Sequence, residues 1–195
     1  PAVSSTSTYP LTNKPQDVWA AKMNDCMKTV YCLDMHYYGK YPGYYMRYLK
    51  ERNIVPAMEE GDEEILKAGR MDYIALNYYR TLCASYLPAD EEHPAGMRVF
   101  RGNEVDFDQY GYCRDEKNVN LKASEYGAQI DPMGLRIVLN DYYSRYHLPM
   151  LITENGLGMA DELTADGRIH DSYRIDYIRG HLEACALALE DGVEL

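Results

Sequence analysis

The sequence predicts an α/β fold with a parallel sheet, in a single domain covering residues 1–195. Helix-like and strand-like segments alternate along the chain, in the order helix, strand, helix, strand, helix. Such alternation is typical of βα units, whose right-handed crossovers keep the strands parallel. Hydrophobic residues make up 46% of the 195 residues, which is the composition of a globular chain with a sizeable core.

The first expected helix covers residues 12–35. Thr12 and Asn13 are candidate N-caps, and Pro15 suits the first turn of a helix. The apolar positions repeat at intervals of four and three residues, which places them on one face of the helix: Trp19, Met23, Cys26, Val30 and Leu33.

Two short helices and a strand are expected next. A tyrosine-rich helix follows a turn within residues 39–54, and residues 61–69 form an acidic first turn, a short helix and a glycine stop. Residues 71–79 mix apolar and aromatic side chains as strands do. Residues 83–130 show little periodicity and are expected to form a long loop.

The C-terminal part is expected to add a helix, a strand and a last helix. Asp131 is the N-cap of the first of these helices, over residues 131–147, and Pro132 is its first residue. Its buried face is expected to contain Leu135, Val138, Tyr142 and Tyr146. The strand covers residues 149–153. The last helix covers residues 171–192, and its apolar stripe is expected to face the core: Ile175, Ile178, Leu182, Cys185 and Leu189.

Charge and cysteine content exclude several classes of partner. A formal net charge of −11 repels phosphate backbones and anionic lipids, so we expect no nucleic-acid partner and no membrane partner. No apolar run is long enough to span a membrane, and the first residues, which lack an initiator Met, do not resemble a signal peptide. Five scattered cysteines without C-x-x-C spacing favour reduced thiols, and hence a cytoplasmic location.

Glu154 is the first candidate for chemistry, because it ends the second predicted strand immediately before an Asn-Gly pair that favours a tight turn. Asn77 and Tyr79 end the other predicted strand, and the carboxyl ends of parallel strands lie at one edge of a sheet. Glu154 is therefore either a solvated turn residue or a nucleophilic carboxylate of glycoside hydrolysis, kept ionised by a phenol donor. The residues alone leave both interpretations open.

Other motifs fail the tests of their spacing. Residues 161–171 resemble a calcium-binding loop up to Gly167, but Tyr173 falls where a bidentate glutamate is needed. The five histidines show no metal-binding spacing, and no nucleotide-binding glycine loop occurs. The residues therefore predict no metal site.

Several motifs, taken in order, resemble glycoside hydrolase family 1. These are "MDYIALNYY", "LITENGLG" and "DGRIHDSYRIDYIRGHLEACALALEDGVEL", while "GKYPGYYMRYLKERNI" and "NLKASEYGAQIDPMGLR" resemble its 6-phospho-β-glucosidase branch. The resemblance covers nearly the whole chain. It implies a partial (β/α)8 TIM barrel, from the end of strand five to helix seven. It also implies retaining β-glycosidase chemistry, a glycoside or phosphoglycoside as the small-molecule partner, and no metal or organic cofactor.

The resemblance also assigns expected roles to residues. Glu154 takes the place of the catalytic nucleophile, and Asn77 and Tyr79 match the pair that binds the substrate beside it. Tyr126 and Ala128 are the aglycone-side candidates, and both stand where tryptophan is usual in the family or its phospho-branch. An aromatic wall for the leaving group is therefore expected to be weaker here.

The sequence departs from the family at two points. The acid/base motif, of the form T-x-N-E-P, does not occur, and the family's last strand, with a tryptophan and the contacts to the sugar 6-position, would follow "DGVEL". We therefore expect this stretch, taken alone, to be inactive and to cover its open edges by forming a homo-oligomer. Two alternatives stay open: a β-glucosidase or β-galactosidase without phosphate preference, and a non-catalytic half-barrel that binds sugar or serves as a scaffold.

Overall fold

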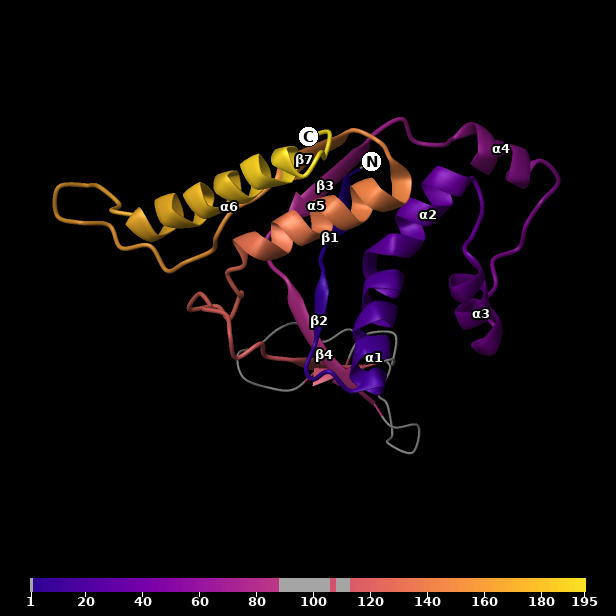
Figure 1. The fold of residues 1–195 in the computed structure, drawn as a ribbon, viewed down its shortest axis with the longest axis horizontal. Helices are drawn as coiled ribbons and strands as arrows, with labels where there is room; N and C mark the ends of the chain where they lie inside the picture. The colour runs from indigo at the N-terminus through magenta and orange to yellow at the C-terminus, as the bar shows by residue number, and fades with distance from the viewer. Residues whose placement is uncertain (1, 88–105, 108–112) are drawn as a thin grey trace.

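The computed structural model describes residues 2–87, 106–107 and 113–195, which form two sheets flanked by helices (Figure 1). One sheet has three parallel strands in the order β1-β3-β7: Ala2–Ser5, Ile74–Tyr78 and Met150–Glu154. The other has four strands in the order β2-β4-β6-β5: Thr8–Pro10, Leu82–Tyr86, Cys113–Glu116 and Asp106–Phe107. The helices are α1 Pro15–Asp25, the π-helical turn η1 Cys26–Val30, α2 Tyr31–Tyr38, α3 Gly43–Glu51, α4 Asp62–Ala68, α5 Pro132–Tyr146 and α6 Ser172–Glu190.

The two predicted strands are confirmed as β3 and β7, which lie side by side and parallel, with α5 between them in the chain. The sequence did not predict β1 and β2, which have four and three residues and are too short to show alternation. The expected loop over residues 83–130 is wrong where β4 and β6 form an antiparallel pair. Residues 88–105 and 108–112 of that stretch lie outside the described chain.

The second sheet begins where the strands of the parallel sheet end: β2 follows β1 and β4 follows β3 along the chain. β2 pairs with β4 in parallel, as β1 pairs with β3, and both pairs run in the same order along the chain. Figure 1 shows β2 and β4 extending away from β1 and β3 on the side where those strands end. The carboxyl ends of β1 and β3 therefore lie in the middle of the molecule.

The first predicted helix is confirmed as α1, η1 and α2, which follow one another without a break. It begins at Pro15, as expected, but its N-cap is Lys14 rather than Thr12 or Asn13. The Thr12 hydroxyl instead donates to Asp17, at 2.5 Å. Four residues of the predicted apolar face are buried, whereas Trp19 is 63% exposed. The predicted helices over residues 39–54 and 61–69 are confirmed as α3 and α4.

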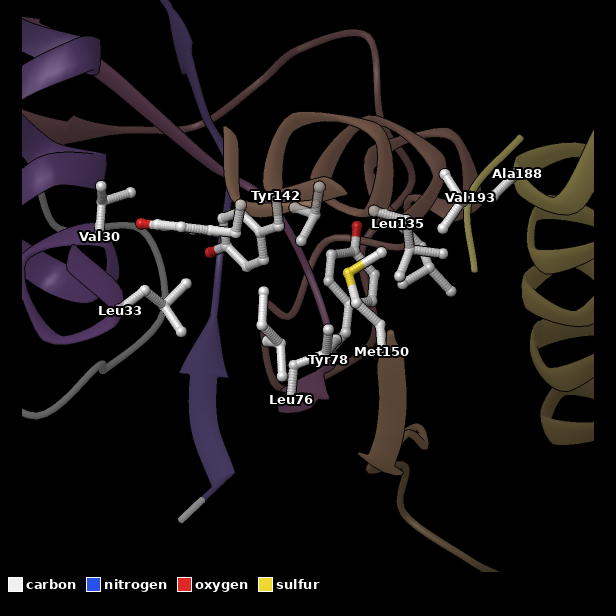
Figure 2. Packing of buried hydrophobic residues seen from close by; sticks show 13 residues of the cluster. Val30, Leu33, Leu76, Tyr78, Leu135, Tyr142, Met150, Ala188 and Val193 are labelled. Carbon is white, nitrogen blue, oxygen red and sulfur yellow. The ribbon is translucent and has the colours of Figure 1, made fainter. Parts of the chain in front are cut away.

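The core lies between the parallel sheet and its helices (Figure 2). Ile74, Leu76 and Tyr78 alternate along β3 and are fully buried on one face of the sheet. The four predicted core residues of α5 are all buried against them, which confirms that helix and its face. Asp131 is the N-cap of α5, as expected, and its side chain accepts a hydrogen bond from the Gly134 backbone N–H, at 2.9 Å.

The predicted buried stripe of α6 is wrong, although the helix itself is confirmed. Leu182 is 64% exposed, and Ile175 and Leu189 are more than half exposed. The buried face instead carries a polar or small set: Tyr177, His181, Ala184 and Ala188. Gly180 lets α6 lie close to the start of α5, because a Cβ atom there would stand 3.1 Å from the Pro132 ring. On the buried face the rings of Tyr177 and His181 stack on each other, and Ala184 and Ala188 need little room.

An ion-pair network joins three helices beside the core. The buried carboxylate of Asp34 in α2 accepts two hydrogen bonds from the Arg145 guanidinium, at 2.8 and 2.6 Å. It also accepts from the hydroxyls of Tyr146 and Tyr44, at 2.8 and 3.0 Å. The network ties α2 to α5 and α3. No helix in the described ranges is both long and apolar enough to cross a bilayer.

Candidate active site

Glu154 is the last residue of β7, and a β-bulge sets its direction. Leu76 pairs with Ile152, but the next residue of β3, Asn77, pairs with Glu154, so Thr153 is an extra residue in β7. A bulge turns the following side chain relative to the regular pleat. The Thr153 hydroxyl donates to the Leu76 carbonyl at 3.1 Å and to Asn77 Oδ1 at 2.5 Å, which fixes the bulge to the neighbouring strand.

Tyr79 and Glu154 meet at the carboxyl edge of the sheet, as the sequence predicts. The Tyr79 hydroxyl donates a hydrogen bond to Glu154 Oε2. This bond to a carboxylate raises the pKa of Tyr79 above its usual range, so the phenol stays protonated and remains a donor. Tyr79 is 43% exposed and Glu154 is exposed, so a ligand in solvent can reach both side chains. Glu154 is thus exposed to solvent but not isolated, because the Tyr79 phenol holds one of its carboxylate oxygens.

The expected tight turn after Glu154 is not formed. Residues 155–160 are irregular, and Gly156 is not among the glycines with positive φ. The side chain of Asn155, rather than a turn, fixes this part of the backbone: its Nδ2 donates to the Tyr78 carbonyl at 2.8 Å. This bond fixes the residue after Glu154 to the end of β3, and hence fixes the direction in which the carboxylate leaves β7.

A tyrosine of α6 completes the support behind the site. The Tyr177 hydroxyl donates to the Tyr79 carbonyl at 2.8 Å and accepts from Asn155 Nδ2 at 3.3 Å. Tyr177 was not predicted from the sequence, because the aliphatic residues of this helix were expected to form its buried face. The signal was the spacing of four residues between Tyr177 and His181, which lie on the buried face.

Asp131 holds the end of β3 in place through hydrogen bonds in the core. Its carboxylate accepts from the hydroxyls of Tyr9 and Thr81, at 2.9 and 2.8 Å, and from the Gly134 N–H. The Tyr78 hydroxyl donates to the Asp131 carbonyl at 2.7 Å. Strands β2 and β3, the break before β4 and the start of α5 are thus joined at one residue, through the carboxylate and the backbone carbonyl of Asp131. These buried hydrogen bonds fix Tyr78, and therefore also the position of Tyr79, which follows it in the chain and lies at the surface.

The two aglycone-side candidates lie on a short turn. Tyr126 is 63% exposed, and its ring lies 3.7 Å from where a Cβ atom on Gly158 would stand, beside the loop that follows Glu154. The Ala128 carbonyl accepts from the Ser124 N–H at 2.8 Å, which closes the turn. The structure thus brings Tyr126 near the end of β7.

The site is open rather than enclosed. A groove of about 680 Å³ follows the exposed face of α6, and a hollow of about 200 Å³ lies near Val3 and Ile74, at the other end of the sheet. Neither lining includes Glu154. Within the ranges that the structure describes, no group of three or more His, Cys, Asp or Glu side chains is arranged to hold a metal ion.

Solved structures of β-glucosidases share this fold. The family 1 β-glucosidase from Thermotoga maritima superposes with a TM-score of 0.77 at 23% identity, over 98% of this chain and 38% of that chain. The β-glucosidase from the same organism in complex with glucoimidazole gives a TM-score of 0.77 at 24% identity, over 100% of this chain and 39% of that one. The parallel sheet and its crossover helices are therefore part of a (β/α)8 barrel, as predicted.

Several curated relatives are named as phospho-β-glucosidases. The aryl-phospho-β-D-glucosidase BglH of Bacillus subtilis (strain 168) is 47% identical over 193 residues, which cover 99% of this chain and 38% of the relative. The 6-phospho-β-glucosidase of Clostridium longisporum is 43% identical over 191 residues, covering 96% of this chain and 37% of the relative. The chain thus spans less than two fifths of the length of these relatives. The family model for glycosyl hydrolase family 1 matches residues 1–195. The chain belongs to glycosyl hydrolase family 1.

Proposed function

We propose that this chain carries the nucleophile of a retaining 6-phospho-β-glucosidase, and that Glu154 is that nucleophile. The observation that carries the proposal is the hydrogen bond from Tyr79 to Glu154, which holds an exposed carboxylate at the carboxyl edge of the barrel strands. Active sites of (β/α)8 barrels are built at this edge. Family membership supports β-glycoside hydrolysis as the reaction.

The reaction is a double displacement. An oxygen of Glu154 forms a bond to the anomeric carbon while the glycosidic C–O bond breaks, and the leaving oxygen takes a proton from an acid group. Water then attacks the anomeric carbon and gives one proton to the conjugate base of that acid group, the bond to Glu154 breaks, and the product keeps its β configuration. The phenol of Tyr79 holds one carboxylate oxygen, so that the other is presented to the sugar.

The proposed substrate is a 6-phospho-β-glucoside. The names of the relatives at 47% and 43% identity support this class. Asn77 and Tyr79 would contact the sugar beside Glu154, and Tyr126 and Ala128 would border the aglycone. Tyr126 offers a phenol ring in place of an indole and Ala128 offers no ring, so aromatic stacking on the aglycone would be weaker than with tryptophan at these positions.

We expect the isolated chain to turn over natural glycosides slowly. The 195 residues contain no T-x-N-E-P motif to protonate the leaving group, and general acid catalysis contributes about 10²–10⁴-fold. A leaving group that is stable as an anion does not need this proton. Activated glycosides therefore test Glu154 without the acid group.

The test is covalent labelling by the dinitrophenyl glycoside of 2-deoxy-2-fluoro-β-D-glucose 6-phosphate. Fluorine destabilises both transition states, while the activated leaving group restores the first step, so a glycosyl-enzyme accumulates. Intact mass should show one added sugar phosphate on the wild type. Glu154→Gln should stay unlabelled, and Glu162→Gln, an exposed control in the following loop, should label like the wild type.

A second reagent, the same fluoroglucoside without the phosphate, separates the alternatives. Faster labelling by the unphosphorylated fluoroglucoside would favour a β-glucosidase without phosphate preference. Absence of labelling by either reagent, in a folded chain, would favour a non-catalytic sugar-binding or structural module and would refute the proposed function.

We also propose that the isolated chain self-associates through α6. Ile175, Ile178 and Leu182 are exposed along a groove whose rims carry both basic and acidic groups, among them Arg179 and Glu183. Two copies of such a helix can pack antiparallel with opposite charges facing each other. Light scattering should report an assembly that Leu182→Glu weakens. Val119→Glu, at an 84% exposed turn position, should leave it unchanged. A monomeric wild type would refute this assignment.

A cytoplasmic location is proposed from the thiols. None of the five cysteines forms a disulfide, and Cys26, Cys83 and Cys113 are buried. Burial raises the pKa of Cys26 and Cys83, which keeps these thiols protonated and slow to oxidise. Free thiols of this kind are typical of a reducing compartment.

A further inference from the structure

The support behind Glu154 forms a closed ring of contacts. Tyr79 donates to Glu154, Glu154 is bonded through the backbone to Asn155, and the Asn155 amide reaches the Tyr177 hydroxyl at 3.3 Å. The Tyr177 hydroxyl donates back to the Tyr79 carbonyl at 2.8 Å. The ring therefore joins the ends of β3 and β7 through one side chain of α6. Tyr177 is 3% exposed and sits behind the site rather than in it.

Tyr177 is itself held rigidly. The imidazole of His181 stacks on its ring, with centroids 3.9 Å apart and planes 28° apart. His181 Nδ1 lies 2.7 Å from the Tyr177 carbonyl, which only accepts, so Nδ1 carries the hydrogen. Burial lowers the pKa of His181, which keeps the imidazole neutral. Burial also raises the pKa of Tyr177 to about 12, so its hydroxyl keeps the proton that it donates.

The close packing of α6 against the start of α5 brings the Tyr177 hydroxyl within hydrogen-bonding distance of the ends of β3 and β7. Gly180 lies between Tyr177 and His181, on the side of Pro132, where an added Cβ atom would come within 3.1 Å of the proline ring. The absence of a side chain at position 180 therefore allows α6 to approach the start of α5 closely.

We propose that Tyr177 is a positioning residue for the Glu154 site. Its hydroxyl holds the end of β3 and the residue after β7 at the separation where the Tyr79 phenol meets the Glu154 carboxylate. The catalytic role of Glu154 rests on the proposed function, whereas the positioning of Tyr79 can be measured without turnover. A purely structural role for Tyr177 would change stability and leave the Tyr79–Glu154 bond as it is.

The test compares Tyr177→Phe with Tyr173→Phe. Phenylalanine keeps the ring that stacks on His181 and removes only the hydroxyl. Tyr173 lies one turn earlier in α6, and its hydroxyl donates to Asp161 in the exposed loop, so Tyr173→Phe is the matched control. Carbon-13 NMR of labelled tyrosine rings follows each titration, and a Tyr79→Phe spectrum assigns the signal of Tyr79. Circular dichroism checks that each variant is folded.

In Tyr177→Phe, the pKa of Tyr79 should fall toward its ordinary value, and in Tyr173→Phe it should equal that of the wild type. Labelling by the activated fluoroglycoside should slow by up to about 10-fold in its first-order rate constant, no more than when the Tyr79 phenol itself is removed, with the half-saturating reagent concentration unchanged. If Tyr177→Phe does not fold, Asn155→Ser removes the other arm of the ring and should lower the pKa of Tyr79 in the same way.

The two readouts separate this inference from the proposed function. A Tyr79 titration that is identical in wild type and Tyr177→Phe would overturn the positioning role, even if Glu154 is labelled. A wild type that is never labelled, together with a Tyr79 pKa that falls in Tyr177→Phe, would refute the proposed nucleophile and uphold the positioning role.

Discussion

Gly134 is a position where one added methyl group should damage the fold. It is the third residue of α5 and has ordinary helical geometry, so the cost is steric rather than a matter of backbone strain. A Cβ atom there would lie 2.2 Å from Thr81 Cγ2, 2.5 Å from the Tyr78 hydroxyl and 2.6 Å from Asp131 Oδ2. All three atoms belong to the buried group that anchors the end of β3.

The magnitude follows from three effects of Gly134→Ala. Overpacking a core costs about 1–3 kcal/mol. The Tyr78 hydroxyl donates to the Asp131 carbonyl at 2.7 Å in the wild type. Displacing the hydroxyl would leave a buried polar group without a hydrogen bond, which costs about 1–3 kcal/mol. Alanine in a helix restores about 1 kcal/mol relative to glycine. The expected loss is about 3 kcal/mol, or about 6–12 °C in Tm for a chain of this size.

The assay is urea or thermal unfolding followed by circular dichroism, with Gly43→Ala as the control. Gly43 opens α3, and nothing lies within 4 Å of a Cβ atom added there. Gly43→Ala should therefore keep or slightly raise the stability of the wild type. If both variants unfold at the same midpoint, the tight packing around Asp131 is not what holds the end of β3, and the reasoning is refuted.

Three further predictions concern charge and the site. Asp34→Ala leaves the Arg145 guanidinium without its buried partner and should cost about 3 kcal/mol in urea unfolding; a loss below about 1 kcal/mol would show that the network of α2 and α5 is dispensable. Burial raises the pKa of Asp25 to about 7, so its contribution to stability is complete below its ordinary pKa and is lost as pH rises through 7. Wild type should thus lose more stability than Asp25→Asn between about pH 5 and pH 8, and equal losses would contradict the buried acid. Tyr79→Phe removes the donor to Glu154 and should slow fluoroglycoside labelling about 10-fold; an unchanged rate would show that the phenol does not orient the carboxylate.

Where local pattern and packing agree, the sequence predicted the structure. The helix that begins at Asp131 has a capping residue, a proline at its first position and one apolar face, and all three features appear in α5. The meeting of Tyr79 and Glu154 followed from the parallel order of β3 and β7 alone. The general rules for parallel sheets therefore predicted both the location of the site and the two side chains that meet there.

The failures have physical causes that a single sequence does not display. β1 is four residues long and is a strand because it pairs with β3, a contact between residues more than 70 positions apart. α6 buries the rings of Tyr177 and His181 and the alanines at positions 184 and 188, so the aliphatic stripe pointed to the wrong face. The Asn-Gly pair after Glu154 predicted a turn, whereas the Asn155 amide is used to bind the next strand.

The most direct measurement of the central claim is the position of the covalent bond in the labelled chain. Proteolysis and tandem mass spectrometry of the fluoroglycoside adduct locate the modified residue, and a crystal structure of the adduct shows its anomeric configuration. The account predicts an α-linked sugar on the carboxylate of Glu154, with the Tyr79 hydroxyl beside it. An adduct on any other carboxylate, with Glu154 unmodified, would contradict it.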